Sequence, residues 1–208
     1  MALIGHNYER LRPNDQSGTF NWLVNVLTTD YFTMVQHDTD VGYIWRTNGN
    51  GREFNFSFAE MTDRIDDVTV DAIESVQYQY YAQTTNGAAK TSQVTIRTAL
   101  KDGTASDATL YEEDSVIDQG NGLFYVYGTL RTTWDGSNEW TMAKVNSLKI
   151  RGLWNDESES GLTCTIHGIS LIVRYRTSQT KTITTDTIGQ VKLHNGTLHL
   201  KEGLTTIK

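Results

Sequence analysis

The chain has 208 residues and a formal net charge of −7, with 38% hydrophobic and 21% charged residues. These values are not typical of a disordered chain or of a membrane protein, and the acidic balance argues against nucleic acid as the main partner, because phosphate binding requires a basic face. The single cysteine, Cys164, excludes an intrachain disulfide and lies in an apolar stretch, so we expect a buried, unreactive thiol.

The N-terminal half alternates apolar runs with clusters of turn residues. It begins without a basic stretch followed by a long apolar run, so we expect no secretion signal. Residues 1–19 show little periodicity, and we expect an extended arm that docks on a neighbour. Residues 59–67 fit one or two helical turns. Strands are expected over 20–26, 41–45, 53–58, 68–83 and 94–100.

The second half continues this pattern up to residue 176. Glu112, Glu113 and Asp114 are interpreted as a solvated acidic loop. Thr141 is placed to cap a short helical turn. Strands are expected over 123–130, 148–154 and 162–176.

The composition favours a β fold, since β-branched and aromatic residues suit the half-buried surface of a sheet. Eight or more short strands at regular spacing are typical of a β-sandwich or barrel. No helix is long enough for a crossover between parallel strands. We therefore predict an all-β, jelly-roll-like antiparallel β-sandwich over residues 20–176.

The last part of the chain differs in composition. Residues 177–190 are Thr-rich and predict a linker, and residues 191–208 predict a hairpin and tail. A two-residue turn at Asn195-Gly196 pairs Leu193 with Leu198. One face of the hairpin is then apolar, formed by Val191, Leu193, Leu198 and Leu200.

A lone hairpin is marginal in water, so its apolar face must be covered. Either the sandwich covers this face or other copies or a partner do. Because the linker carries the hairpin away from the core, we favour the second alternative and interpret the four residues as an assembly interface.

No catalytic signature is visible, so we expect neither an enzyme nor a cofactor. Glycine-rich nucleotide loops and a nucleophile motif are both missing. His194 and His199 share a hairpin face without further ligands, and Asp38 and Asp40 fit an ordinary turn, although their spacing also suits a hard cation. We therefore predict no metal site.

Aromatic residues are the stronger binding candidates. Trp134, Tyr78 and Tyr80 are weak candidates for a stacking platform for sugars, and of these Trp134, next to a turn, is expected to be exposed. Packing in the core or at an interface is the ordinary alternative, because Trp and Tyr bury large areas.

Two segments carry a family resemblance. Residues 140–152 read WTMAKVNSLKIRG, and residues 169–175 read ISLIVRY. Together, over about residues 120–176, they resemble jelly-roll domains in tailed-bacteriophage virion proteins. The resemblance implies a non-enzymatic structural component of the virion, such as a capsid decoration, head-fibre or tail accessory protein.

This resemblance sets the expected partners. We expect a homo-oligomer, such as a trimer, that docks on other virion proteins and is located in the virion. The alternative function is a carbohydrate-binding module, lectin-like or receptor-binding, that contacts host surface glycans. Neither nucleic acid nor a membrane is an expected partner.

Overall fold

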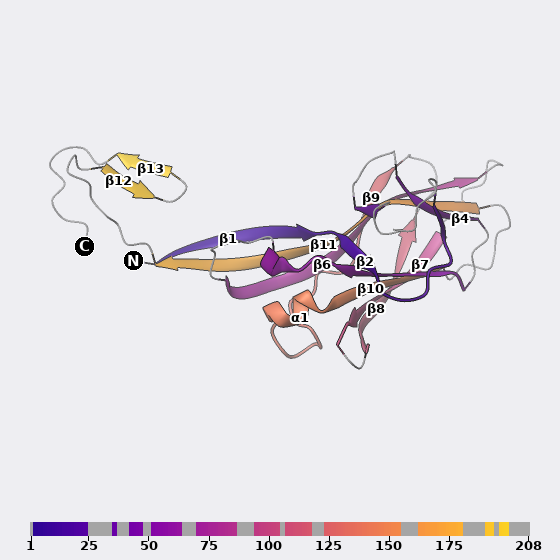
Figure 1. Ribbon diagram of the computed structural model, residues 1–208, viewed down its shortest axis with the longest axis horizontal. Coiled ribbons are helices and arrows are strands. Elements are labelled where there is room, and N and C mark those ends of the chain that lie inside the picture. Colours follow the sequence, from indigo (N-terminus) through magenta and orange to yellow (C-terminus); the bar gives the residue numbers. More distant parts are fainter. Residues whose placement is uncertain are drawn as a thin grey trace.

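The computed structural model describes residues 2–24, 35–36, 42–47, 51–63, 70–86, 94–104, 107–117, 123–154, 162–180, 190–193 and 196–199. Within these ranges almost every element is a strand, and the strands form two antiparallel sheets and a separate two-stranded one (Figure 1). The predicted all-β, jelly-roll-like sandwich is confirmed.

The first sheet has six strands in the order β3-β4-β11-β6-β9, and β1 also pairs with β11. β4 and β1 occupy successive parts of one edge of β11, while β6 follows the other edge. The strands are β1 (Ala2–Leu11), β3 (Leu23–Val24), β4 (Ile44–Thr47), β6 (Val70–Asn86), β9 (Phe124–Tyr127) and β11 (Leu162–Thr180).

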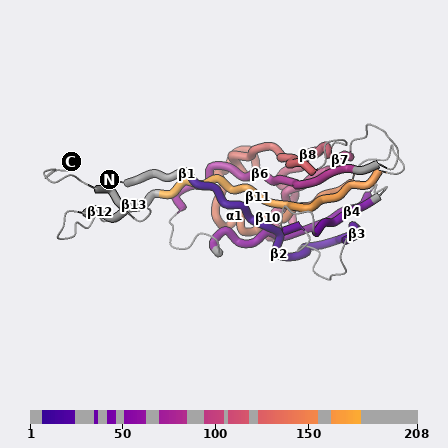
Figure 2. Tube along the Cα trace, turned by 90° about the horizontal axis from the view of Figure 1, so that it is seen from above, coloured from indigo at the N-terminus to yellow at the C-terminus, as the bar shows by residue number. Residues whose placement is uncertain are grey.

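The second sheet has five strands in the order β2-β5-β10-β7-β8. Its strands are β2 (Pro13–Gln16), β5 (Glu53–Phe58), β7 (Val94–Asp102), β8 (Thr109–Ile117) and β10 (Leu148–Trp154). Figure 2 shows how far β1, β6 and β11 run side by side, which makes the first sheet the longer of the two.

The core lies between the sheets and follows the expected alternation. Phe54, Phe56 and Phe58 of β5 are buried, as predicted from their spacing, and so is Cys164 of β11. Gly152 of β10 permits this packing, because a Cβ atom there would lie 2.1 Å from the Phe54 ring.

Two short helical elements lie wholly within the described residues and join strands. A 3-10 turn, η2 (Met61–Asp63), falls inside the segment expected to be helical. The α-helix α1 (Met142–Asn146) is capped by Thr141, whose side chain accepts a hydrogen bond from the backbone N–H of Lys144, as predicted.

β11 contains a bulge that keeps its apolar residues on one side. Ile166 lies opposite Ala82 and Gly168 lies opposite Tyr81, so His167 is an extra residue on β11. A bulge inserts one residue into one strand of a pair and changes its alternation. As a result Ile166 and Ile169 are both fully buried, although three positions separate them.

Residues 1–19 do not stand apart from the sandwich as the sequence suggested. β1 pairs with β11 over ten residues, and β2 pairs with β5, so the segment contributes to both sheets. The long β11 offers β1 a free edge beyond β4, and backbone pairing needs no alternation in the sequence of β1. Residues 177–180 of the expected linker likewise belong to β11.

The acidic loop is also a correction. Glu112, Glu113 and Asp114 lie in the middle of β8, where Asp114 is opposite Arg97 of β7. Opposite charges directly across a pair stabilise a sheet, so an acidic run is compatible with a strand when cations face it.

The C-terminal hairpin consists of β12 (Gln190–Leu193) and β13 (Gly196–His199). Its register differs from the prediction, since Val191 pairs with Leu198 and Leu193 with Gly196. Gly196 thus belongs to the strand rather than to the turn. Leu200 lies outside the described residues, and the assembly interface stays a prediction.

Candidate binding groove

The outer face of the first sheet, which points away from the second sheet, carries the candidate site. β6 supplies the pattern: Tyr78, Tyr80 and Ala82 point into the core, so alternation turns Gln79 and Tyr81 outward. Strands β4, β9 and β11 lie beside β6 and add further side chains to this face.

Five aromatic rings contact one another across the sheet. Tyr43 lies 4.8 Å from His167, and His167 lies 6.2 Å from Tyr81, measured between ring centroids. Tyr81 lies 4.8 Å from Tyr125, which is 6.3 Å from Tyr127. We call this row the aromatic ladder, and its members come from the residue before β4, from β11, from β6 and from β9.

One end of the ladder opens into a hollow of about 650 Å³, here called the neutral hollow. Its described lining residues carry aromatic rings, hydroxyls, an amide and an aliphatic side chain, and none is an acid, lysine or arginine. They are Tyr43, Trp45, Gln83, Leu123, Thr163, Thr165 and His167.

The other end opens into a second hollow of about 600 Å³, here called the charged hollow. Tyr127 of the ladder lines it together with Tyr8, whose side chain is 71% exposed. Its described lining also includes two arginines and one acid, namely Arg10, Arg174 and Glu74.

The two hollows lie along one sheet face. Gln83 lines the neutral hollow and Glu74 the charged one, and these residues are nine positions apart on β6, or about 30 Å at ~3.3 Å per residue. Gln79 lies between them, with its Oε1 accepting from Ser170 Oγ at 3.1 Å. Its buried Nε2 has no hydrogen-bond partner among the described residues. The hollows and the ladder therefore follow one face of the first sheet, and we call them together the groove.

Tyr78 and Tyr80, predicted for sugar stacking, are core residues instead. Their rings are 3% and 0% exposed, so neither can meet a ligand from solution. Both are even-numbered residues of β6, which point into the core. Tyr81 is odd-numbered, like Gln79 and Gln83, and lies on the outer face of the sheet. This alternation was a usable sequence signal for Tyr81.

Trp134, expected to be exposed, is half-buried on the segment between β9 and α1. Lys144 of α1 places its Nζ 4.4 Å from the centre of the Trp134 ring. Trp134 is absent from the described lining of both hollows, so the structure does not bring the three predicted stacking residues together.

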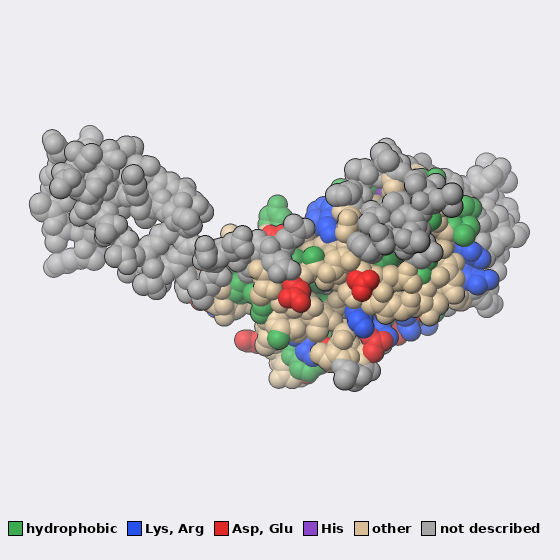
Figure 3. Space-filling model, viewed as in Figure 1, with side chains coloured by type: hydrophobic (Ala, Val, Ile, Leu, Met, Phe, Trp, Pro, Cys, Tyr) green, Lys and Arg blue, Asp and Glu red, His purple; other side chains and the backbone are tan. Residues whose placement is uncertain are grey.

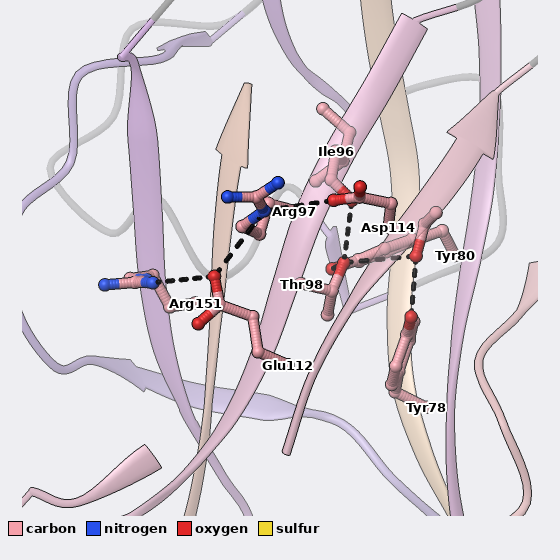
Figure 4. Close-up of polar contacts among 9 residues, drawn as sticks. Tyr78, Tyr80, Ile96, Arg97, Thr98, Glu112, Asp114 and Arg151 are labelled. Carbon is pink, nitrogen blue, oxygen red and sulfur yellow. Dashed lines mark hydrogen bonds and ion pairs between the residues drawn. The ribbon is translucent and has the colours of Figure 1, made fainter. Parts of the chain in front are cut away.

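The buried tyrosines join a network of hydroxyls between the sheets (Figure 4). Tyr78 Oη lies 2.6 Å from Ser115 Oγ, and Tyr80 Oη lies 2.9 Å from Thr98 Oγ1. Thr98 and Ser115 are themselves 3.2 Å apart. Burial raises the pKa of both tyrosines, so they are protonated at every physiological pH.

On the outer face of the second sheet, arginines of β7 and β10 form ion pairs with acids of β8. Arg97 Nε lies 3.1 Å from Asp114 and 3.6 Å from Glu112, and Arg151 lies 3.7 Å from Glu112 (Figure 4). Figure 3 shows acidic and basic side chains interspersed over the region of β8 and β10. Glu113, the third acid of β8, contacts Arg131 at 2.9 Å.

The described part of the chain contains no cluster of three or more His, Cys, Asp or Glu side chains that could hold a metal ion. Asp38, Asp40 and His194 lie outside it, and only the backbone of His199 is described. Burial raises the pKa of the Cys164 thiol, so this cysteine is not a reactive thiolate. No helix in the described ranges is long and apolar enough to cross a membrane.

Comparison with known proteins gives matches to solved structures alone. No protein-family model and no curated protein matches the sequence. A structure described as "CBM4 structure and function" has 11% sequence identity and a TM-score of 0.38, with 79% of this chain and 92% of that chain covered. The N-terminal cellulose-binding domain of Cellulomonas fimi β-1,4-glucanase C has 12% identity and a TM-score of 0.37, with 81% and 94% covered. Likeness at this level concerns the fold alone.

Proposed function

We propose that this chain is a non-catalytic carbohydrate-binding module whose groove holds a linear glycan. The aromatic ladder is the observation that carries the proposal, because Tyr43, Tyr81, Tyr125 and Tyr127 are partly or largely exposed on one sheet face, with the buried His167 between Tyr43 and Tyr81. Tyr125 and Tyr127 are 43% and 53% exposed. Rings that pack on a sugar's C–H face bury apolar area without needing charge.

The polar groups of the groove fit the same ligand. Gln83, Thr163 and Thr165 line the neutral hollow, and Gln77 lines the charged one. Amides and hydroxyls both donate and accept hydrogen bonds, as sugar hydroxyls do. A groove of about 30 Å, estimated from the strand rise, is long enough for several sugar units.

The arrangement suits binding rather than hydrolysis. A glycosidase needs two carboxyl groups that face each other across the scissile bond. Among the described lining residues of both hollows, Glu74 is the single carboxylate. The proposed module therefore holds a glycan without cleaving it.

The test is a glycan array followed by calorimetric titration of the best ligand with the wild-type protein and Tyr125→Ala. Tyr125 contacts two ladder rings, and we expect its removal to weaken binding at least about tenfold, as for an aromatic anchor. Val116→Ala is the matched control, since Val116 is 44% exposed but lies on β8 of the second sheet. Equal affinity of Tyr125→Ala and wild type would refute the proposal.

The virion role stays a separate proposal, supported by the resemblance of residues 140–152 and 169–175. The self-pairing of β12 with β13 favours assembly, because an isolated hairpin is marginal without a partner surface. We expect the full chain to be an oligomer in solution and a chain ending at Thr180 to be a monomer. The end point must be Thr180, since β1 pairs with β11 up to that residue. A monomeric full chain would contradict this proposal.

A further inference from the structure

We infer that the glycan is acidic and that Arg174 binds one of its carboxylates, an inference that rests on the proposed carbohydrate-binding function. The two hollows differ in charge, although the ladder connects them. The described lining of the neutral hollow carries no formal charge. The charged hollow has two arginines against one glutamate, on a chain whose net charge is −7.

Arg174 is held at a defined place in this hollow. It lies on β11 between two strands, opposite Tyr8 of β1 and Ser75 of β6. Next to it, Glu74 is an extra residue on β6, because Arg174 pairs with Ser75 and Tyr175 pairs with Ile73. The guanidinium therefore projects from the middle strand of a rigid sheet rather than from a loop.

The charge of Arg174 is available to a ligand. The side chain is exposed, and no carboxylate in the described part of the chain forms an ion pair with it. This contrasts with Arg97, Arg131 and Arg151, each of which contacts an acid. A guanidinium presents a planar fork of donors that matches a carboxylate in a bidentate contact.

The surroundings of Arg174 select a sugar acid over a simple anion. Tyr8 and Tyr127 line the same hollow and are 71% and 53% exposed, so two exposed rings share this hollow with the cation. A uronic acid combines a sugar ring, which stacks on tyrosine, with a carboxylate, which pairs with arginine. Because the chain as a whole is acidic, recognition depends on this short-range contact rather than on long-range attraction.

The decisive experiment compares acidic oligosaccharides with their uncharged methyl esters, and neutral oligosaccharides are added as a further reference. The full-length protein is titrated at neutral pH with oligogalacturonates, oligomannuronates and the methyl esters of both, and with neutral cello- and xylo-oligosaccharides of the same length. We expect an acidic oligosaccharide to bind at least about tenfold more tightly than its methyl ester, as for a hydrogen bond to a charged group. Arg174→Gln should remove this preference and leave the affinity for the ester unchanged.

Arg176→Gln is the matched control, because Arg176 is two residues further along β11 and is absent from the described lining of the charged hollow. It should keep the preference for the acid. Equal binding of acid and ester, or an unchanged preference in Arg174→Gln, overturns the inference while glycan binding itself stands. Failure of every acidic and neutral oligosaccharide to bind overturns the proposed function as well.

Discussion

The two outer faces of this sandwich are built from similar strands but present different chemistry. On the second sheet, Arg97 and Arg151 both contact Glu112, so charges of opposite sign neutralise one another. On the first sheet, rings stand side by side in the aromatic ladder, and Arg174 forms no ion pair with a described residue. Two faces of one fold thus differ in what they leave for a partner.

This difference shows that pairing across strands, rather than composition, decides which face can bind. A cation opposite a carboxylate already has an ion-pair partner within the protein. The exposed faces of neighbouring aromatic rings, by contrast, can still contact a ligand. The acids of β8 therefore stabilise the second sheet through ion pairs, whereas the tyrosines of β6 and β9 can contact a ligand in the groove. Four predictions test whether glycan binding depends on the first sheet alone, and they are given from the largest expected effect to the smallest.

Deletion of His167 should remove glycan binding with little loss of stability. Without this extra residue, Ile166 and Ile169 remain on the inner side of a regular strand, and Gly168 stays opposite Tyr81. The His167 side chain is 3% exposed, so it contacts and supports the rings of Tyr43 and Tyr81 rather than meeting the ligand, and its removal takes that support from both rings. We expect affinity to fall about 100-fold, or about 2.7 kcal/mol, in calorimetric titration.

His167→Ala is the matching variant, since it removes the ring but keeps the bulge. It should lose affinity by a similar factor. Melting temperatures within a few degrees of wild type in both variants will show that the fold is intact. Full binding by the deletion variant would show that the ladder is not the site.

Asp102→Asn should cost about 2 kcal/mol of unfolding free energy at neutral pH, from the conversion of a pKa shift into energy. Burial acts to raise the pKa of Asp102, but hydrogen bonds from Lys144, Thr104 and Ser147 outweigh it and lower the pKa from 3.8 to about 2. The folded state thus favours the carboxylate. The contribution of ionised Asp102 to the free energy of unfolding is therefore complete above about pH 4. It is lost as the pH falls toward 2.

Denaturant unfolding of wild type and Asp102→Asn between pH 7 and pH 2 measures this contribution. The two curves of unfolding free energy against pH should converge in acid. Parallel curves would show that the ion pair with Lys144 contributes nothing. Glycan affinity at neutral pH should be the same in both proteins, because Asp102 lies at the end of β7 in the second sheet.

Tyr80→Phe should lower the unfolding free energy by about 1 kcal/mol, the usual net value of one hydrogen bond. The substitution removes the contact between Tyr80 Oη and Thr98 Oγ1 and leaves the ring in the core. Binding should not change, since Tyr80 is fully buried. A loss of affinity larger than the loss of stability would show that the core network shapes the groove.

Asp114→Asn should have the smallest effect. Its partner Arg97 is exposed and also contacts Glu112, and exposed ion pairs contribute little. We expect no measurable change in melting temperature or glycan affinity. A clear drop in melting temperature at low salt would show that the charges on this face act together as a network.

The sandwich was predictable from the sequence because alternation acts locally. Phe54, Phe56 and Phe58 mark the inner side of β5 without any knowledge of its neighbours. The bulge in β11 also left a signal, since Leu162, Cys164 and Ile166 are even-numbered, whereas the apolar residues from Ile169 onward are odd-numbered except Ile172. A change of parity inside one strand indicates one extra residue.

The groove was not predictable because its parts are distant in sequence. Tyr43, Tyr81, Tyr125 and His167 come together only when β4, β6, β9 and β11 pair in one sheet. The acidic run of Glu112 to Asp114 was misinterpreted as a loop for the same reason, because its cation partners lie on β7, on β10 and on the segment between β9 and α1. Position along one strand shows which side a residue faces, but not what stands beside it.

The hydroxyl network between the sheets makes the inside of the sandwich observable. Thr98 Oγ1 donates to the carbonyl oxygen of Ile96, so Tyr80 and Ser115 must donate to Thr98, and Tyr78 in turn to Ser115. The protons of Tyr78, Ser115 and Thr98 therefore point in one sense along a path that ends at the Ile96 carbonyl oxygen, and the proton of Tyr80 joins this path at Thr98. Because these hydroxyl protons are buried, they should exchange slowly with solvent, and each should give its own resonance in a proton NMR spectrum. These resonances would show whether the two sheets stay packed together while a ligand binds to the outer face of the first sheet.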